Sequence, residues 1–169
     1  MNVMTPKDTR TVMTDLVLPS ETNPLNNLMG GRLLHWMDIT AAISARRFSR
    51  RIVVTATVNH VSFNRPIPMG SVVTLYAKVS RSFSSSMEVF VDVFTENNET
   101  GKLIKCNQAI YTFVAVDQQG KPINVPQMRP ETEEEQERFD GALRRKQLAL
   151  VLSGRMKACE ATELKSLFD

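Results

Sequence analysis

The chain has 169 residues, of which 42% are hydrophobic, and its formal net charge is +3. A chain of this length fits one globular domain that can bury a core without metals or disulfides. Its two cysteines, Cys106 and Cys159, lie far apart in the sequence and form no CxxC motif. Neither a disulfide framework nor a structural zinc site is therefore predicted, and a reducing cytoplasm is expected.

The sequence also argues against two classes of partner. The first residues contain no apolar stretch typical of a signal peptide, and no run of 18 apolar residues occurs anywhere. We therefore expect a cytoplasmic protein with no membrane partner. The mild positive charge lacks the dense lysine and arginine stripe of a nucleic-acid interface, so no nucleic-acid partner is expected either.

A short strand and one long helix are predicted in the first third of the chain. Thr11–Leu18 has the β-branched and apolar residues of a strand, and Pro19 and Ser20 end it. An asparagine-rich loop follows at residues 23–27. A mostly apolar helix is then expected from about Gly31 to Phe48.

After this helix the hydrophobic period changes to two, which predicts strands. The first, Ile52–Val58, is rich in β-branched residues. The connector Asn64–Gly70 holds two prolines and a glycine, which are excluded from the inside of a ladder. Three longer strands are expected at about Ser71–Phe83, Met87–Glu96 and Leu103–Val116.

A second helix is predicted near the end of the chain. Residues 131–137 are mostly acidic, and Arg144, Arg145 and Lys146 follow them, which is the order that the helix macrodipole favours. One long apolar helix lying on antiparallel strands, with an extra C-terminal helix, is an α+β arrangement.

Asp38 is the residue of the long helix that most needs an explanation. It stands among tryptophan, methionine, isoleucine and alanine, and burying an unpartnered charge costs several kcal/mol. Gly30 and Gly31 open the helix, where free backbone N–H groups can bind an oxyanion. This layout fits the hydrolysis of a carbonyl compound. The alternatives are a carboxylate that caps a loop or pairs with an arginine, and a glycine pair that only shapes the turn.

Four segments in order resemble the hotdog-fold acyl-CoA thioesterases, and the nearest match is the cytosolic acyl-CoA hydrolase group. Residues 23–38 resemble the active-site segment of that family, with its pattern N-x-x-G-G-x-(apolar)-(apolar)-x-x-(apolar)-D. Residues 53–56 resemble the family's second strand, residues 85–89 its central hairpin and residues 112–117 its last strand. The resemblance covers about residues 10–130.

The resemblance implies a hotdog fold, in which an antiparallel sheet wraps around one long central helix. We expect residues 8–126 to form the hotdog domain and residues 127–169 to form a C-terminal helical extension. Protomers of the family pair their sheets edge to edge as homodimers, with active sites at the interface, and dimers commonly assemble into hexamers as trimers of dimers. Acyl-CoA is the implied partner. No metal or other cofactor is implied, because coenzyme A is part of the substrate and of the product.

The resemblance also assigns catalytic roles. Asp38 resembles the family's general base or nucleophile, which polarises a water molecule or attacks the thioester directly. Asn27 matches the family's asparagine, which would orient the water or bind the carbonyl oxygen. Gly30 and Gly31 would supply N–H groups for the oxyanion and let the substrate approach the backbone closely.

Three polar residues near this motif are given lesser roles. Asn23 and Asn26 are expected to be loop residues, because asparagine favours turns. His35 lies three residues before Asp38 and can share its helix face. The chain has no G-x-S-x-G motif for a serine hydrolase triad, so we expect His35 to be exposed or to lie at an interface.

Two segments resemble the family's surfaces for coenzyme A. The pantetheine arm would run along a strand edge, and the phosphates would meet hydroxyl groups and a guanidinium at a serine-rich turn. An ordinary solvated hairpin is the alternative for this turn. The expected contact residues are Val54, Thr55 and Ala56 on the strand edge, and Arg81, Ser84, Ser85 and Ser86 at the turn.

The predicted function is that of an acyl-CoA thioesterase, which hydrolyses fatty acyl-CoA to a free fatty acid and CoA. The first alternative is a non-catalytic module that binds or senses acyl-CoA on the same fold. The presence of both Asn27 and Asp38 argues against it, because a binding module needs neither. A nucleic-acid-binding protein that uses residues 144–146 is the weakest alternative.

Overall fold

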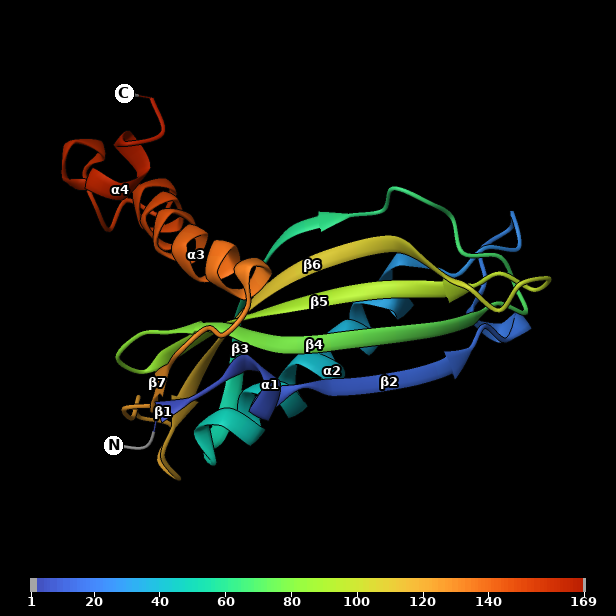
Figure 1. The fold of residues 1–169 in the computed structure, drawn as a ribbon, viewed down its shortest axis with the longest axis horizontal. Coiled ribbons are helices and arrows are strands. Elements are labelled where there is room, and N and C mark those ends of the chain that lie inside the picture. Colours follow the sequence, from blue (N-terminus) through green and yellow to red (C-terminus); the bar gives the residue numbers. More distant parts are fainter. Residues whose placement is uncertain (1–2, 169) are drawn as a thin grey trace.

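The centre of the fold is a five-stranded antiparallel sheet that packs against a 20-residue helix, α2 (Figure 1). The structure is a computed structural model and describes residues 3–168. Its elements in chain order are β1 (Val3–Met4), α1 (Pro6–Thr9), β2 (Thr11–Leu16), η1 (Pro19–Glu21), α2 (Gly30–Ser49), β3 (Ile52–Ser62), β4 (Val72–Ser82), β5 (Ser86–Glu96), β6 (Leu103–Val116), β7 (Gln127–Met128), α3 (Glu133–Leu152), η2 (Ala158–Glu160) and α4 (Thr162–Lys165).

The sheet has the strand order β2-β4-β5-β6-β3, and each neighbouring pair is antiparallel. β3 follows α2 directly in the chain but lies at the edge of the sheet opposite β2. β1 and β7 form a separate parallel ribbon, which joins the N-terminal residues to the segment before α3. The outer edge of β3 is therefore unpaired within the described sheet, and such an edge can pair with another strand.

α2 buries one face against the sheet and leaves the other face accessible. The alternate residues of β4, β5 and β6 that point toward α2 join its buried residues in a single core cluster. On the accessible face, Ile39 and Ile43 are 39% and 41% exposed. The buried apolar residues of the helix are Leu33, Trp36, Met37, Ala41, Ala45 and Phe48, which recur at helical spacing.

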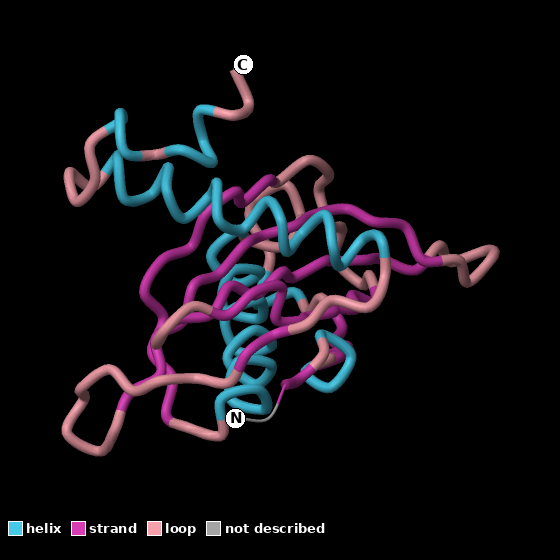
Figure 2. The backbone as a smooth tube through the Cα atoms, turned by 60° about the vertical axis from the view of Figure 1, so that its left-hand side comes forward, coloured by secondary structure: helices cyan, strands magenta, loops and turns pink. Residues whose placement is uncertain are grey.

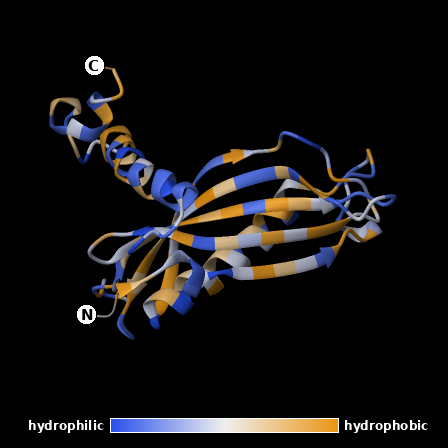
Figure 3. Ribbon diagram, viewed as in Figure 1, coloured by the Kyte–Doolittle hydropathy of each residue, from blue (hydrophilic) through white to orange (hydrophobic). Residues whose placement is uncertain are grey.

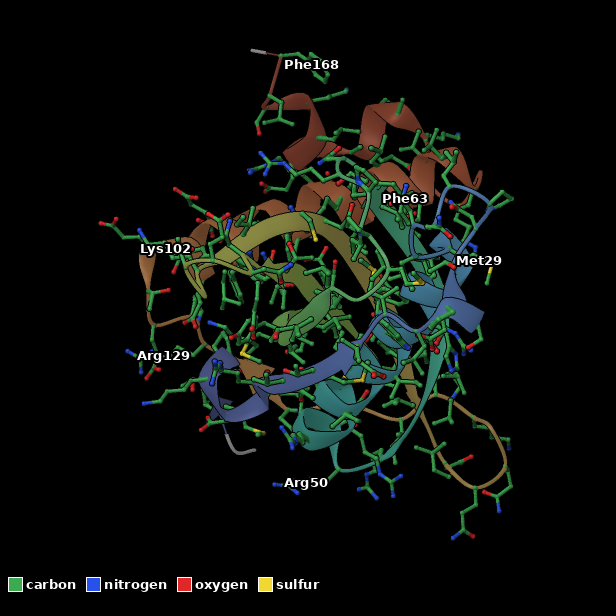
Figure 4. The ribbon with its side chains drawn as sticks, turned by 90° about the vertical axis from the view of Figure 1, so that its right-hand side faces the viewer. Met29, Arg50, Phe63, Lys102, Arg129 and Phe168 are labelled. Carbon is green, nitrogen blue, oxygen red and sulfur yellow. The ribbon has the colours of Figure 1, made fainter. Side chains whose placement is uncertain are left out.

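α3 lies on the opposite face of the sheet from α2 (Figure 2). Its first half is largely hydrophilic (Figure 3), and charged side chains fasten it to the strands. The three connecting ion pairs have N···O distances of 3.1 Å for Lys78–Glu135, 2.9 Å for Asp92–Arg138 and 2.8 Å for Glu88–Arg145. Beyond α3 the chain projects away from the sheet, and Phe168 near its end is 84% exposed (Figure 4).

The predicted α+β architecture is confirmed, with small differences at the ends of elements. α2 begins and ends one residue outside the predicted range, and β6 has the predicted bounds. β3 continues past the predicted end at Val58 to Ser62. This extension is irregular, because the pairing with β6 shifts register between Asn59 and Ser62 and His60 has a φ of +52°. The described residues contain no helix long and apolar enough to cross a membrane.

Candidate active site

Asp38 lies near the middle of α2, where the buried face of the helix meets its accessible face. Its Oδ1 accepts a hydrogen bond of 2.8 Å from the hydroxyl of Thr55 on β3. Met37, the preceding residue, is fully buried, whereas Asp38 itself is half-buried. The charge is therefore neither unpartnered nor cut off from water, which explains how an acid fits into this helix. Sequence reasoning missed this partner, because it depends on how β3 packs against α2.

Tyr111 is a second residue near Asp38 that sequence reasoning missed. Its hydroxyl donates a hydrogen bond of 3.0 Å to the backbone oxygen of Leu34, about one turn before Asp38. Burial raises the pKa of the Tyr111 phenol, and the negative charge of Asp38 raises it further. Tyr111 therefore stays protonated and holds this part of α2 against β6. Tyr111 alternates along β6 with Ala109 and Phe113, which are also buried. This alternation in the sequence could have indicated that Tyr111 points inward.

The start of α2 leaves two backbone N–H groups free. The first hydrogen bonds of the helix run from Arg32 and Leu33 to the backbone oxygen of Met29, at 3.0 and 3.1 Å. Among the described residues, the N–H groups of Gly30 and Gly31 donate to no acceptor. Free N–H groups at a helix start carry the positive end of the macrodipole and can stabilise an oxyanion.

The two glycines have different surroundings. A Cβ atom on Gly30 would lie 3.3 Å from the ring of Phe63, whereas one on Gly31 would meet nothing within 4 Å. Figure 4 shows Phe63 and Met29 on the same side of the molecule, far from Arg50 at the other end of the helix. Gly31 therefore adjoins open space that a ligand can enter.

Asp38 and the start of its own helix are too far apart to act on one carbonyl group. Gly30 precedes Asp38 by eight positions in α2, which at 1.5 Å per residue is a separation of about 12 Å. A carbonyl bond is only about 1.2 Å long. The carboxylate of one chain can therefore work together with these N–H groups only if a second copy of the chain supplies one of them.

The asparagine-rich loop is held by Asn23. Its side-chain oxygen accepts the N–H groups of Leu25 and Asn27 at 3.0 and 3.2 Å. Asn26 has a φ of +58°, a conformation that asparagine tolerates. Asn23 and Asn26 therefore both shape the loop. Asn27 is half-buried and its backbone pairs with that of Pro68.

The strand residues expected to contact coenzyme A lie on the open edge of the sheet. Val54, Thr55 and Ala56 are all exposed on β3, and a register shift separates Thr55 from Thr57. His35 on α2 is exposed as well, in line with the expectation for it. The described residues contain no group of three or more histidine, cysteine, aspartate or glutamate side chains placed to hold a metal ion.

The serine-rich turn is less open than the sequence suggested. Ser84 is exposed, but Ser85 and Ser86 are half-buried, and the backbone oxygens of Ser84 and Ser85 accept N–H groups from neighbouring segments. The guanidinium of Arg81 donates to the backbone oxygen of Phe139 at 3.0 Å and lies 4.2 Å from the centre of its ring. Arg81 thus helps to hold α3 in place, and its guanidinium also lies 5.7 Å from the centre of the Phe83 ring, next to the turn.

A sheet wrapped around a helix that carries a carboxylate, with free N–H groups at the helix start, is the arrangement expected of a hotdog-fold thioesterase. The sequence model of the Thioesterase superfamily matches residues 25–102. The chain is 44% identical over 129 residues to the uncharacterized acyl-CoA thioester hydrolase YkhA of Bacillus subtilis, which covers 76% of this chain and 75% of that protein. The chain belongs to the family of hotdog-fold acyl-CoA thioesterases.

Solved structures agree with this assignment. The acyl-CoA hydrolase of Staphylococcus aureus, solved with butyryl coenzyme A and coenzyme A, has a TM-score of 0.85 and 30% identity, and the match covers 91% of this chain and 96% of that one. The hexameric thioesterase y2039 of Yersinia pestis has a TM-score of 0.64 and 33% identity, over 69% of this chain and 94% of its own.

Variants of the Staphylococcus aureus hydrolase allow the spacing of three polar residues to be compared with this chain. An aspartate, an asparagine and a threonine of that protein have each been replaced by alanine. Its threonine follows its aspartate by 17 positions, the same separation as between Asp38 and Thr55. Its asparagine precedes the aspartate by 15 positions, and the residue 15 positions before Asp38 in this chain is Asn23.

Proposed function

We propose that this protein hydrolyses fatty acyl-CoA to a free fatty acid and CoA, in a site that two copies of the chain share. The observation that best supports the proposal is the Asp38–Thr55 pair, which lies at an open sheet edge about 12 Å from the free N–H groups of its own helix. Membership of the thioesterase family supports the reaction class.

Asp38 is the base or the nucleophile of the reaction. As a base, it takes a proton from water while the water oxygen bonds to the thioester carbon. The N–H groups of Gly30 and Gly31 in the second copy stabilise the resulting oxyanion. The C–S bond then breaks, and the sulfur receives the proton from Asp38. As a nucleophile, Asp38 would displace CoA to form an anhydride that water hydrolyses. In both routes Thr55 binds Oδ1, which leaves Oδ2 for the reaction.

The proposal includes a homodimer formed along β3, and a hexamer built as a trimer of such dimers. Ile52, Val54 and Val58 expose 54%, 46% and 40% of their surface on this unpaired strand, and Ile39 and Ile43 of α2 are exposed as well. Pairing two β3 strands would satisfy the open backbone groups and cover these side chains. Hexamers among the structural relatives support the larger assembly. We place the reaction in the cytoplasm.

The test is release of free thiol from acyl-CoAs of several chain lengths. Asp38→Asn should lower kcat by about a hundredfold or more, because removing a general base typically costs 10²–10⁴-fold. Asp140→Asn, the same change at an exposed position of α3, should leave kcat unchanged. Full turnover by Asp38→Asn would remove Asp38 from the mechanism. A wild type that binds CoA but turns over no acyl-CoA would instead support a sensing module.

Two asparagines compete for the role of orienting the water or the carbonyl. The sequence motif favours Asn27, and the spacing in the Staphylococcus aureus hydrolase favours Asn23. Asn27→Ala and Asn23→Asp separate them, because aspartate keeps the oxygen that accepts from Leu25 and Asn27 but loses the amide donor. The variant with the larger fall in kcat, at unchanged oligomeric state, identifies the residue.

A further inference from the structure

A cleft of about 210 Å³ lies between α3 and the outer face of the sheet. Its walls are mostly apolar and include Ile110 and Val114 of β6 and Ala142 and Ala149 of α3. Tyr111, between two strand residues that line the cleft, points to the other face and bonds to α2. This α3 cleft is therefore separated from Asp38 by the thickness of the sheet.

The charges that line the α3 cleft do not balance. Glu88 is its only acidic residue among the described ones, and that carboxylate is already engaged by Arg145 at 2.8 Å and by the hydroxyl of Ser80 at 2.6 Å. Lys146 and Arg155 also line the cleft, and neither forms an ion pair with any described residue.

Lys146 is the less hydrated of these two cations. Its ammonium lies 3.8 Å from the centre of the Phe83 ring, and the residue is half-buried on the side of α3 that lines the cleft. Burial lowers the pKa of Lys146, and the positive charge of Arg81 lowers it further. A partly buried cation without a counter-charge is unfavourable, so an anion placed beside it would be stabilised.

We propose that the α3 cleft binds an organic carboxylate with an apolar body, the carboxylate beside Lys146 and Arg155 and the body against Ile110, Val114 and Ala142. An engineered cavity of about 150 Å³ holds benzene, so the cleft accommodates a ring or a short aliphatic chain but not a whole acyl-CoA. The free acid released by hydrolysis belongs to this class, and its identification as the natural ligand rests on the proposed function.

The site connects to the catalytic face through one strand. Asn59 and His60 of β3 line the cleft, and Thr55 of the same strand binds Asp38. The register shifts of β3 and the positive φ of His60 lie in this segment, and such irregular backbone is common at ligand sites. A ligand in the cleft would thus adjoin the strand that positions the base.

The test measures how fast acetic anhydride acetylates individual lysines of the wild-type protein, followed by peptide mass spectrometry. Octanoate at ten times its dissociation constant should slow acetylation of Lys146 about tenfold, because only about a tenth of the sites remain free. The exposed Lys157 should react at an unchanged rate. Octanol, which has the same body without the charge, should protect neither lysine. Equal protection by octanol, or none by octanoate, would overturn the proposal.

A second variant keeps the charges and fills the space. Ala149→Leu narrows the cleft from an exposed position of α3, so folding should be retained. Octanoate should no longer protect Lys146 in this variant, and unchanged protection would contradict binding in the cleft. Since no acyl-CoA is present in these measurements, a failure of the proposed hydrolase function would leave their outcome unaffected.

Discussion

The two faces of the sheet are held by different kinds of contact. Against α2 the contacts are almost entirely apolar, and their side chains form one continuous core. Against α3 many of the contacts are ion pairs and cations stacked on rings, such as Arg138, which lies 4.4 Å from the centre of the Phe90 ring. Apolar contacts stabilise in proportion to buried area, whereas the contacts of α3 depend on geometry and charge.

This difference can be set beside the lengths of the structural relatives. The hexameric Yersinia pestis thioesterase matches about two-thirds of this chain with nearly its whole length. In this chain α3 is attached to the outer face of the sheet by three ion pairs.

The largest effect should come from a charge on the exposed apolar edge of the sheet, at β3. Val58→Asp places a charge on the open edge of β3, and we expect a monomer with hydrolase activity lowered by about a hundredfold or more, because Asp38 loses the second helix start. Light scattering and thiol release measure the two effects. Val12→Asp is the matched control, since Val12 is similarly exposed but lies on β2, at the opposite edge. An active monomer would show that one chain contains a complete site.

Removing an ion pair between α3 and the sheet should loosen α3 and leave the packing of α2 unchanged. Glu88 is 4% exposed, and Glu88→Gln leaves Arg145 without its counter-charge; breaking a buried pair in this way costs about 3–5 kcal/mol. We expect faster hydrogen exchange in α3 and unchanged exchange in α2. Glu137→Gln, at an exposed position of the same helix, is the control. Equal loosening of both helices would mean that the two faces are not independent.

Acid should loosen α3 by a smaller amount. Burial alone would raise the pKa of Glu135, but hydrogen bonds from the N–H of Glu131 and from Lys78, with the charge of Lys78, hold it below its ordinary value. The stabilisation is therefore present above the ordinary pKa of about 4.5 and is lost as the pH falls through the lower folded value. Exchange in α3 should rise over this interval in the wild type and in Glu133→Gln, but should show no such step in Glu135→Gln. A step that persists in Glu135→Gln would assign it to another carboxylate.

The sequence was sufficient for the elements whose pattern is local. The apolar period of α2 and the alternation of β6 gave their ranges to within one residue. Asn59 and His60 interrupt the alternation of β3, so its last residues could not be recognised as strand.

Contacts between distant segments were beyond the sequence. The bond from Thr55 to Asp38 depends on the path of β3 past α2, and the position of Arg81 depends on where α3 attaches. Charged residues at the start of α3 indicated a helix, but they did not show that three of its side chains would pair with the outer face of the sheet.

The 12 Å between Asp38 and its own helix start has a genetic consequence. If each site combines the carboxylate of one chain with the N–H groups of another, a chain that has lost only Asp38 still offers a sound helix start. Mixed with a chain whose helix start alone is damaged, it restores one complete site in each mixed pair. Two alleles that are inactive alone would then complement each other, whereas two alleles damaged in the same half would not.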